Sequence, residues 1–500
     1  MNCYFNIMDN ISHLTPQNVW KHFYALTQIP RPSGHMEEIT DFIEDFGKNL
    51  GLETRRDAAN NICICKPATP GYENKPTVIL QSHLDMVPQA NSDTPFDFTK
   101  DKIQAYIDGD WVKAKGTTLG ADNGIGMATT MAILEAADLQ HGPLEGLFTT
   151  DEETGMYGAF AIRPGFIDGK IMLNLDSEQD GELYIGCAGG ADVTAQFQYE
   201  DEEWIPDNDI AVKVSLTGLK GGHSGVDIHL GRANANKLMF RFLQDAWLTY
   251  GVRLSSISGG SLRNAIPREA FAVLVVDGEK YERIREMAAA YEELFNQEFE
   301  GIENPIVFKA EQAPVAPAGI KLIPMHIQNK LACAVMACPN NVINLFATIP
   351  DTVETSVNMA IVQSSEGLIE MKFLARSSSE SKKKAICRSI ESVFELAGAD
   401  FIETNNEYPG WDPNPKSAVL AVMEQVFEQQ RGEKPKVEVM HAGLECGIIL
   451  SNVPGLDTVS FGPTIKYPHS PDEMVEIAGV QKFWDYLVAI LNQIPSKTSN

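Results

Sequence analysis

The sequence is short of positive charge and of long apolar runs. Its 500 residues contain 40 lysines and arginines against 68 aspartates and glutamates, giving a formal net charge of -28. Such a surface repels phosphates and anionic lipid headgroups, so we expect neither a nucleic-acid nor a membrane partner. No run approaches the ~18 apolar residues of a membrane span, and residues 1–21 lack the basic start and apolar core of a signal peptide. We therefore predict a soluble cytoplasmic protein.

Cysteine pairs with metal-binding spacing are also absent. The eight cysteines are scattered and include no Cys-x-x-Cys pair. Cys63 and Cys65 lie in an apolar, strand-like run, where alternate side chains point to one face. We interpret them as buried free thiols rather than a metal clip. Any metal is therefore expected to be held by nitrogen and oxygen.

One glycine-rich stretch, residues 117–126, delivers an acid to the start of an apparent helix. Asp122 precedes apolar residues near helical spacing, so it could simply cap that helix. Gly124 and Gly126 do not make a phosphate-binding loop, because neither a third glycine nor Gly-Lys-Ser/Thr follows. The interpretation of Asp122 depends on the residues that gather around it.

Three apolar segments resemble buried strands of a parallel sheet, and each ends in polar residues. The first leads to His83 and Asp85, the second to Glu152 and Glu153, and the third to Asp176. In an open α/β sheet, the site lies beyond the carboxyl ends of the strands. We therefore expect these side chains to meet at one edge.

The pattern changes twice along the chain, which is long enough for at least two cores. From about residue 210, strands and helices alternate as in an inserted α+β domain of two related halves. After residue 400 the first pattern returns and includes His469. We predict an α/β catalytic domain, with a mixed and mainly parallel sheet flanked by helices, interrupted by an α+β lid. The predicted bounds are 1–207 and 400–500 for the catalytic domain and 208–399 for the lid.

The polar residues at the predicted edge need a source of positive charge. Five carboxylates in one cleft would raise one another's pKa values unless cations were present. Two divalent ions remove that conflict, and imidazole with carboxylate ligands suits Zn²⁺, Mn²⁺ or Co²⁺. The set comprises His83, Asp85, Asp122, Glu152, Glu153, Asp176 and His469.

Two local patterns in this set have a chemical logic and a simpler alternative. A metal-bound histidine usually donates its other ring N–H to a carboxylate, which suits His83 and Asp85. Adjacent acids outside a strand can face different ways, so that Glu152 and Glu153 divide metal binding and proton transfer between them. The simpler alternatives are that His83 is a structural histidine held by hydrogen bonds, and that Glu152 and Glu153 belong to a solvated acidic turn.

Taken together, these motifs resemble those of the co-catalytic two-zinc metallopeptidases, a family that includes carnosinase and carboxypeptidase G. Within it, the likeness is greatest to the aminoacyl-histidine dipeptidase branch and spans nearly the whole chain. The motifs are His83-Leu-Asp85-Met-Val-Pro, Gly120-Ala-Asp122-Asn-Gly, Asp151-Glu152-Glu153-Thr-Gly, Asn174-Leu-Asp176, Gly221-Gly-His223-Ser-Gly, Arg263-Asn264-Ala-Ile-Pro, His441-Ala-Gly-Leu-Glu445-Cys-Gly and Pro468-His469-Ser.

The resemblance implies a ligand set for two ions, Zn²⁺ first, with Co²⁺ or Mn²⁺ as alternatives. Asp122 would bridge the ions, and the peptide bond that follows it would be cis. His83 and Asp176 would bind one ion. Glu153 and His469 would bind the other.

The resemblance also implies catalytic roles. Glu152 would be the general base, and Asp85 would orient the metal-binding histidine. His223 of the lid would stabilise the oxyanion, and Asn264 would help to bind substrate. A serine nucleophile beside His223 does not fit, because Val226 breaks the Gly-x-Ser-x-Gly pattern; a histidine held in a lid turn is the open alternative.

The implied activity is hydrolysis of the peptide bond of unblocked dipeptides, Xaa-His among them, with broader tolerance. His441 and Glu445 would contact this small peptide, and Glu445 would bring a carboxylate near its free amine. An N-acyl amino acid deacylase on the same scaffold is one alternative. A non-catalytic metal-binding protein is another, and a homodimer stays open as the assembly.

Overall fold

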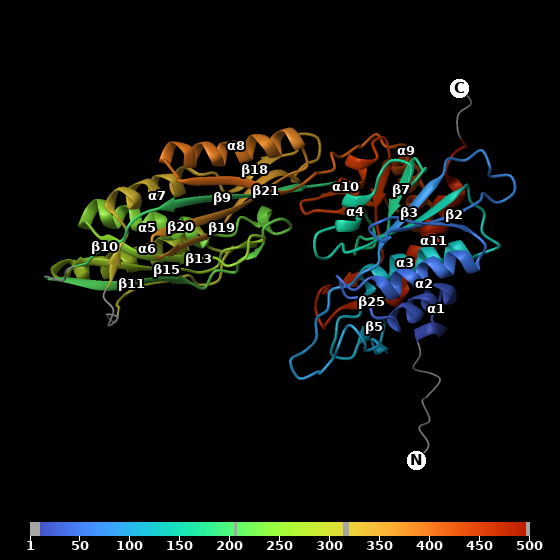
Figure 1. The fold of residues 1–500 in the computed structure, drawn as a ribbon, viewed down its shortest axis with the longest axis horizontal. Helices are drawn as coiled ribbons and strands as arrows, with labels where there is room; N and C mark the ends of the chain where they lie inside the picture. The colour runs from blue at the N-terminus through green and yellow to red at the C-terminus, as the bar shows by residue number, and fades with distance from the viewer. Residues whose placement is uncertain (1–10, 205–207, 314–319, 497–500) are drawn as a thin grey trace, which may run out of the picture. The chain divides into compact units, whose positions relative to one another are not determined.

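The computed structural model of the chain describes residues 11–204, 208–313 and 320–496. These residues form two compact units. The first unit comprises the described residues up to Gly186, Trp411–Val439 and those from Leu444 onward. The second unit comprises Cys187–Gly410 and Met440–Gly443. An α+β unit thus interrupts an α/β unit, which confirms the predicted fold class (Figure 1).

The first unit is built around an eight-stranded mixed sheet in the order β1-β2-β6-β3-β7-β23-β8-β22. Its four central strands, β6, β3, β7 and β23, are parallel, whereas β1, β2 and β8 pair antiparallel with their inner neighbours. Every residue of β3 and β6 is buried, including Gln81 and Glu145, whose side chains have hydrogen-bond partners. The strands are β1 (Glu53–Arg56), β2 (Ile62–Lys66), β3 (Val78–His83), β6 (Leu144–Thr149), β7 (Ile171–Asn174), β8 (Glu182–Cys187), β22 (Lys436–Met440) and β23 (Asp457–Ser460).

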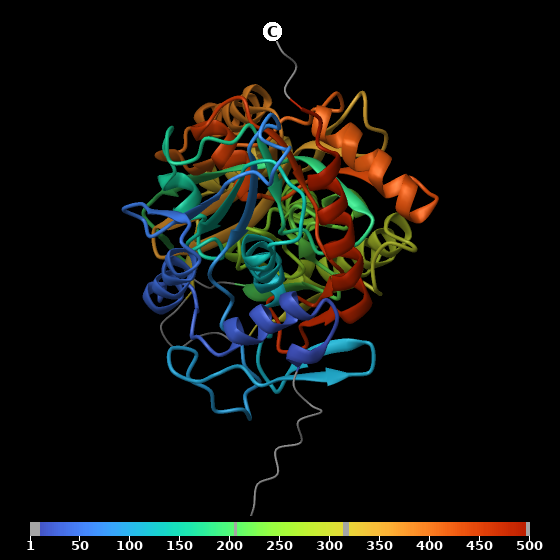
Figure 2. The ribbon, with the colours of Figure 1, turned by 90° about the vertical axis from the view of Figure 1, so that its right-hand side faces the viewer.

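Helices cover this sheet, with α3 against β3 and β6, α2 against β1 and β2, and α9 against β23. Figure 2 shows α11, in red, running beside the strands of the first unit. Helix α3 is buried all round, as expected of a helix made of small and apolar residues. The helices are α1 (Gln17–Thr27), α2 (Glu37–Asn49), α3 (Ala121–Glu135), α4 (Tyr157–Ala161), α9 (Ala418–Arg431), α10 (Glu445–Asn452) and α11 (Ile477–Gln493).

A smaller four-stranded sheet, β24-β25-β5-β4, completes the first unit. Residues 474–476 form β25, because they pair with β5 and β24. The strands are β4 (Ala105–Asp108), β5 (Trp111–Ala114), β24 (Ile465–Lys466) and β25 (Met474–Glu476). No helix in the described ranges is both long enough and apolar enough to cross a bilayer.

The second unit is an antiparallel sheet of nine strands with one layer of helices (Figure 1). Its order is β16-β11-β15-β13-β19-β20-β9-β21, and β18 also pairs with β19. The strands are β9 (Gly189–Gln198), β11 (Asp209–Thr217), β13 (Arg253–Gly259), β15 (Ala270–Asp277), β16 (Val307–Gln312), β18 (Asn341–Leu345), β19 (Val353–Ser365), β20 (Leu368–Ser377) and β21 (Phe401–Tyr408). The helices are α5 (Ala235–Tyr250), α6 (Tyr281–Glu298), α7 (Met325–Ala337) and α8 (Glu380–Ala397).

The borders of the second unit differ from those expected. The predicted border at residue 207 lies outside the described residues. Strands β9 and β21 pair with each other in the nine-stranded sheet, so the unit begins at Cys187 and extends to Gly410. Strand β21 is half-exposed and largely polar, so it lacks the apolar alternation that would have marked it in the sequence.

Candidate active site

The carboxyl ends of the central strands carry the predicted imidazole and acidic residues. His83 is the last residue of β3, and Glu152 and Glu153 lie in a turn that begins three residues after the end of β6. Asp176 follows β7 by two residues. Because these strands are parallel, their carboxyl ends lie at one edge of the sheet, as predicted from the sequence.

Asp122 reaches this edge from the first turn of α3. The residue before the helix is Gly120, and no side chain caps the helix, so the interpretation of Asp122 as a helix cap is wrong. Gly120 has φ 70°, and a Cβ there would lie 2.5 Å from Arg31 Nη2, so only glycine suits this turn. The peptide bond between Asp122 and Asn123 is cis, as expected.

The two carboxylate oxygens of Asp122 face two different imidazoles. Oδ1 lies 3.0 Å from His83 Nε2, and Oδ2 lies 3.2 Å from His469 Nε2. His83 Nε2 also lies 3.3 Å from Asp176 Oδ1, and His469 Nε2 lies 3.0 Å from Glu153 Oε2. Asp122 therefore lies between two groups of donors, as a bridging carboxylate requires.

These donors fit a metal ion. His83, Asp122 and Glu153 each offer a ligand atom, and the three atoms lie within 4.8 Å of one another. The Glu153 side chain is only 5% exposed, so a solvated acidic turn does not describe it. Its Oε1 atom is buried and has no hydrogen-bond partner in the described part of the chain. Nitrogen and oxygen donors of this kind suit Zn²⁺, Mn²⁺ or Co²⁺.

The electrostatics of the edge also call for a cation. Burial raises the pKa of Glu152 well above its ordinary value and raises the pKa of Glu153. Burial lowers the pKa of His83, but Asp176 and the neighbouring carboxylates outweigh it, so that the pKa rises well above normal. Hydrogen bonds to Asp122 and Glu153 raise the pKa of His469 to about 11. The carboxylates thus draw protons onto the imidazoles, and divalent ions would supply this positive charge instead.

Asp85 lies beside the histidine and holds the acidic turn by hydrogen bonds. Its carboxylate is fully buried, and Oδ1 lies 3.3 Å from His83 Nδ1. The backbone N–H groups of Glu152 and Glu153 donate to it over 3.0 and 3.1 Å, and Ser33 Oγ donates over 2.7 Å. This geometry suits the orienting role that the resemblance implies.

Two residues that support this edge were not identified from the sequence. Glu473 is buried and accepts hydrogen bonds from the backbone N–H groups of residues 119–122, at 2.7, 2.9, 2.7 and 3.2 Å in chain order. Arg31 donates to the carbonyl oxygens of Leu84, Asp85 and Gly120. Glu473 could have been suspected from its place four residues after His469, whereas nothing in the sequence around Arg31 marked it.

Replacing Glu473 by glutamine is expected to weaken metal binding and kcat/KM by ~10- to 100-fold, the usual cost of losing a residue that holds a ligand. The amide cannot accept four N–H groups, so the loop that carries Asp122 loses its anchor. Metal content after dialysis against a weak chelator measures the effect directly. Glu476→Gln, on the following strand, is the control. Unchanged metal retention in Glu473→Gln would contradict the anchoring role.

Three further predicted residues lie in the second unit, where His223 and Asn264 are neighbours. The strand Gly222–His223 pairs with Ala265–Ile266, and Ser224 N donates to Asn264 O over 2.8 Å. His223 Nδ1 accepts hydrogen bonds from the N–H groups of Gly225 and Val226, so its proton lies on Nε2. Burial, assisted by Arg376, lowers the pKa of His223 to about 4. His223 is therefore a neutral N–H donor.

His441 and Glu445 are both buried, in different units. His441 Nε2 lies 2.7 Å from Ser356 Oγ in the second unit, and burial lowers its pKa to about 3. Glu445 begins α10 in the first unit and accepts hydrogen bonds at Oε2 from Gln81 and Thr149, both 2.7 Å long. Burial raises the pKa of Glu445 to about 7. Its Oε1 atom has no hydrogen-bond partner among the residues described.

Known proteins are similar to this chain over almost its full length. The chain is 43% identical over 490 residues to a cytosol non-specific dipeptidase from Escherichia coli (strain K12), covering 98% of this chain and 100% of that protein. The crystal structure of aminoacylhistidine dipeptidase from Vibrio alginolyticus matches with a TM-score of 0.90 and 46% identity, covering 98% of this chain and 99% of that one. Aminopeptidase PepT from Bacillus cereus ATCC 10987 shares the fold, with a TM-score of 0.56 and 17% identity, over 96% of this chain and 99% of its own.

One family model matches the central strands of the first unit, the loop of Asp122 and the segment of His469 together. Residues 79–493 match peptidase family M20/M25/M40. This range begins within β3 and ends at the last residue of α11, so it contains all seven residues proposed for metal binding and catalysis in the first unit. The chain belongs to peptidase family M20/M25/M40.

Proposed function

We propose that this protein is a dinuclear metallodipeptidase that hydrolyses unblocked dipeptides, Xaa-His among them, with broader tolerance. The observation that carries the proposal is the position of Asp122, whose two oxygens face His83 and His469 separately. The names of the two relatives that match nearly the whole chain, a cytosol non-specific dipeptidase and an aminoacylhistidine dipeptidase, support the substrate class.

The proposed ligand set divides between two ions, Zn²⁺ first, with Co²⁺ or Mn²⁺ as alternatives. Asp122 would be shared by both ions, His83 and Asp176 would hold one, and Glu153 and His469 would hold the other. When bound, such ions polarise the attacking water and the scissile carbonyl. The separate contacts of the two imidazoles with Asp122 support this division.

In the proposed reaction, Glu152 takes the proton of the attacking water and then passes it to the leaving amine. Asp85 orients two groups, the turn that carries Glu152 and the ring of His83. Neither group therefore has to be ordered during the reaction. His223 donates its Nε2–H to the oxyanion. Its neutral state and Nδ1 contacts support this role. Asn264, exposed beside it, helps to bind the peptide.

Selection for a free amine is proposed to depend on Glu445, with His441 as a second substrate-binding residue. The Oε1 atom of Glu445 has no hydrogen-bond partner in the described ranges and could accept from an ammonium group. The residue is fully buried, so this contact requires the side chains that cover it to move. Both proposals concern binding rather than bond cleavage.

Unblocked dipeptides are expected to be cleaved at least ~10²-fold faster than their N-acetyl forms, because a buried carboxylate left without its cation costs several kcal/mol. The measurement is kcat/KM on Xaa-His, Xaa-Leu, N-acetyl-Xaa-His and tripeptides, with Zn²⁺, Mn²⁺ or Co²⁺ at saturation. Faster turnover of the acetylated compounds would favour the N-acyl amino acid deacylase. Comparable turnover of tripeptides would contradict a dipeptidase.

A non-catalytic metal-binding protein is the other alternative. It has no use for a proton acceptor such as Glu152 beside a complete ligand set, which supports an enzyme instead. We propose a cytoplasmic location, in line with the name of the Escherichia coli relative. A homodimer stays a proposal, and the subunit-exchange experiment described below bears on it.

A further inference from the structure

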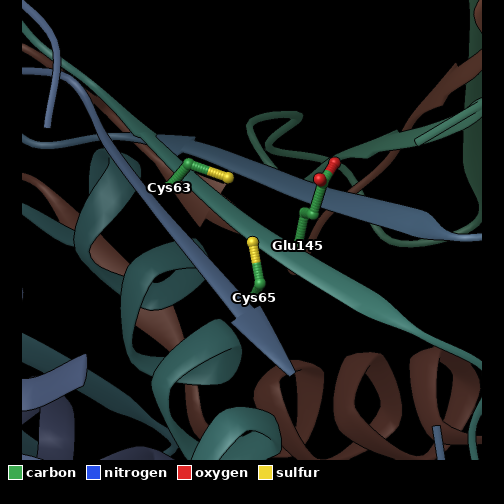
Figure 3. Close-up of side chains that lie close together, drawn as sticks. All are labelled: Cys63, Cys65 and Glu145. Carbon is green, nitrogen blue, oxygen red and sulfur yellow. The ribbon is translucent and has the colours of Figure 1, made fainter. Parts of the chain in front are cut away.

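A second group of metal-ligand side chains lies in the eight-stranded sheet, on strands that the proposed reaction does not use. Cys63 and Cys65 are alternate residues of β2, so their side chains share one face. Glu145 of β6 lies directly opposite Cys65 in the antiparallel register. One ligand atom from each of the three lies within 4.8 Å of the other two. Figure 3 shows both sulfur atoms and the carboxylate on the same side of these strands.

The geometry of this trio suits a tetrahedral ion. Zn–S bonds of ~2.3 Å at a tetrahedral angle would place two sulfur atoms about 3.8 Å apart. That spacing lies within the 4.8 Å that already encloses the ligand atoms, so small side-chain rotations suffice. Glu145 is also held in place, because its carboxylate accepts hydrogen bonds from the backbone N–H groups of Asp168 and Gly169.

An ion has access to the trio from one side. Cys63 is fully buried, whereas Cys65 is half-buried. Cys65 and Glu145 line a pocket of about 330 Å³. The fourth coordination position would face this pocket and take a water molecule, as in zinc sites with three protein ligands.

Two cationic residues, Lys66 and Arg55, line the same pocket, and both have partners: Lys66 donates to the carbonyl oxygens of Ile133 and Ala136. Arg55, opposite Cys63 on β1, is paired with Glu53 at 2.8 Å and with Asp168 at 3.1 Å. Two thiols and one carboxylate form a donor set that a cation preferring sulfur ligands can bind.

We propose that Cys63, Cys65 and Glu145 form a binding site for a single thiophilic divalent cation of the Zn²⁺ or Cd²⁺ class, separate from the proposed active site. On binding, the thiol protons leave to solvent and two thiolate bonds form. The sequence favoured free thiols because the third ligand comes from a strand 80 residues further on, which cysteine spacing cannot reveal. The inference does not rest on the proposed function.

Cadmium titration of the metal-free protein tests the site, because the ultraviolet band of cadmium bound to thiolate reports only sulfur ligands. The residues of the proposed active site include no cysteine, so they contribute nothing to this band. We expect a band intensity that corresponds to one thiolate-bound Cd²⁺ per chain; the total Cd²⁺ bound can be higher, because the proposed active site can bind Cd²⁺ without contributing to the band. Cys65→Ser, at a half-buried position that tolerates the change, should lose most of the band. Glu145→Gln should keep the band but weaken Cd²⁺ binding by ~10-fold or more.

The control is Cys333→Ser, at an exposed cysteine of α7 in the second unit, which should leave the band unchanged. Dipeptide hydrolysis with restored metal should be equal in wild type, Cys65→Ser and Cys333→Ser, and circular dichroism verifies that each variant folds. A band that persists in Cys65→Ser, or that grows only in large excess of Cd²⁺, would overturn the proposal. None of these outcomes depends on whether the protein is a dipeptidase.

Discussion

Replacing Glu152 by glutamine is expected to lower kcat by ~10²- to 10⁴-fold while the protein keeps its metal. Glutamine has nearly the same shape as glutamate but cannot take a proton from the attacking water. The hydrogen bond from residue 152 to Asp85 comes from the backbone N–H, so the turn should survive the change. The measurements are kcat on a dipeptide and the metal content per chain, both on the same preparation.

Glu153 is the matched comparison, because it has the same side chain one residue later. Its Oε2 atom lies 3.0 Å from His469 Nε2, within the proposed ligand set. Glu153→Gln should therefore lose metal as well as activity, and added metal should restore part of the activity. Excess metal should not rescue Glu152→Gln. Equal loss of metal in the two variants would refute the assignment of base and ligand.

His223→Ala is expected to lower kcat by ~10²- to 10³-fold, the range found when one oxyanion donor is removed. Because the pKa of His223 is about 4, the ring is neutral throughout the range in which the enzyme can be assayed. The loss should therefore be the same from pH 6 to pH 9. His229→Ala, at an exposed histidine of the same unit, is the control and should keep full activity. A loss that grows as the pH falls would mean that a protonated imidazole stabilises the oxyanion.

Subunit exchange shows whether His223 serves its own chain. An inactive Glu152→Gln protein is mixed with an inactive His223→Ala protein under conditions that exchange subunits, with exchange followed by labelled chains. We expect no recovery of activity, because the large inserted unit can supply in one chain the surfaces that a partner would otherwise provide. Recovered activity would place His223 across a dimer interface.

The strands that form the sheet edge could be predicted because their burial is uniform. Strands β3 and β6 are buried at every residue, and each has an apolar segment, 78–80 in β3 and 147–148 in β6, before the polar residues at its end. Strand β19 is harder to predict from the sequence, for the opposite reason. It buries Thr355, Ser356 and Asn358, whose partners are the Ser377 hydroxyl, the His441 ring and backbone carbonyl oxygens. Polar residues of this kind break the apolar alternation, and sequence alone cannot show that distant partners satisfy them.

The candidate ligands and the orienting Asp85 could be predicted, but the residues that anchor the loop of Asp122 were not identified. Imidazole and carboxylate groups at strand ends are visible as residue types, whereas the anchoring of Asp122 depends on where a chain segment 350 residues later returns. Glu473 acts on backbone N–H groups, which every residue possesses, so the identities of residues 119–122 contain no sign of it. Arg31 likewise binds only carbonyl oxygens.

The position of β23 sets the order in which the two units can be completed during synthesis. This strand, residues 457–460, lies between β7 and β8 in the interior of the eight-stranded sheet. A growing chain that has not reached it leaves the facing edges of both strands without their hydrogen-bond partner. All nine strands of the second unit's sheet precede residue 409, so that sheet has every strand available earlier. A growing chain that ends between residues 409 and 456 therefore contains every strand of the second unit's sheet. The eight-stranded sheet of the first unit still lacks β23 at that stage.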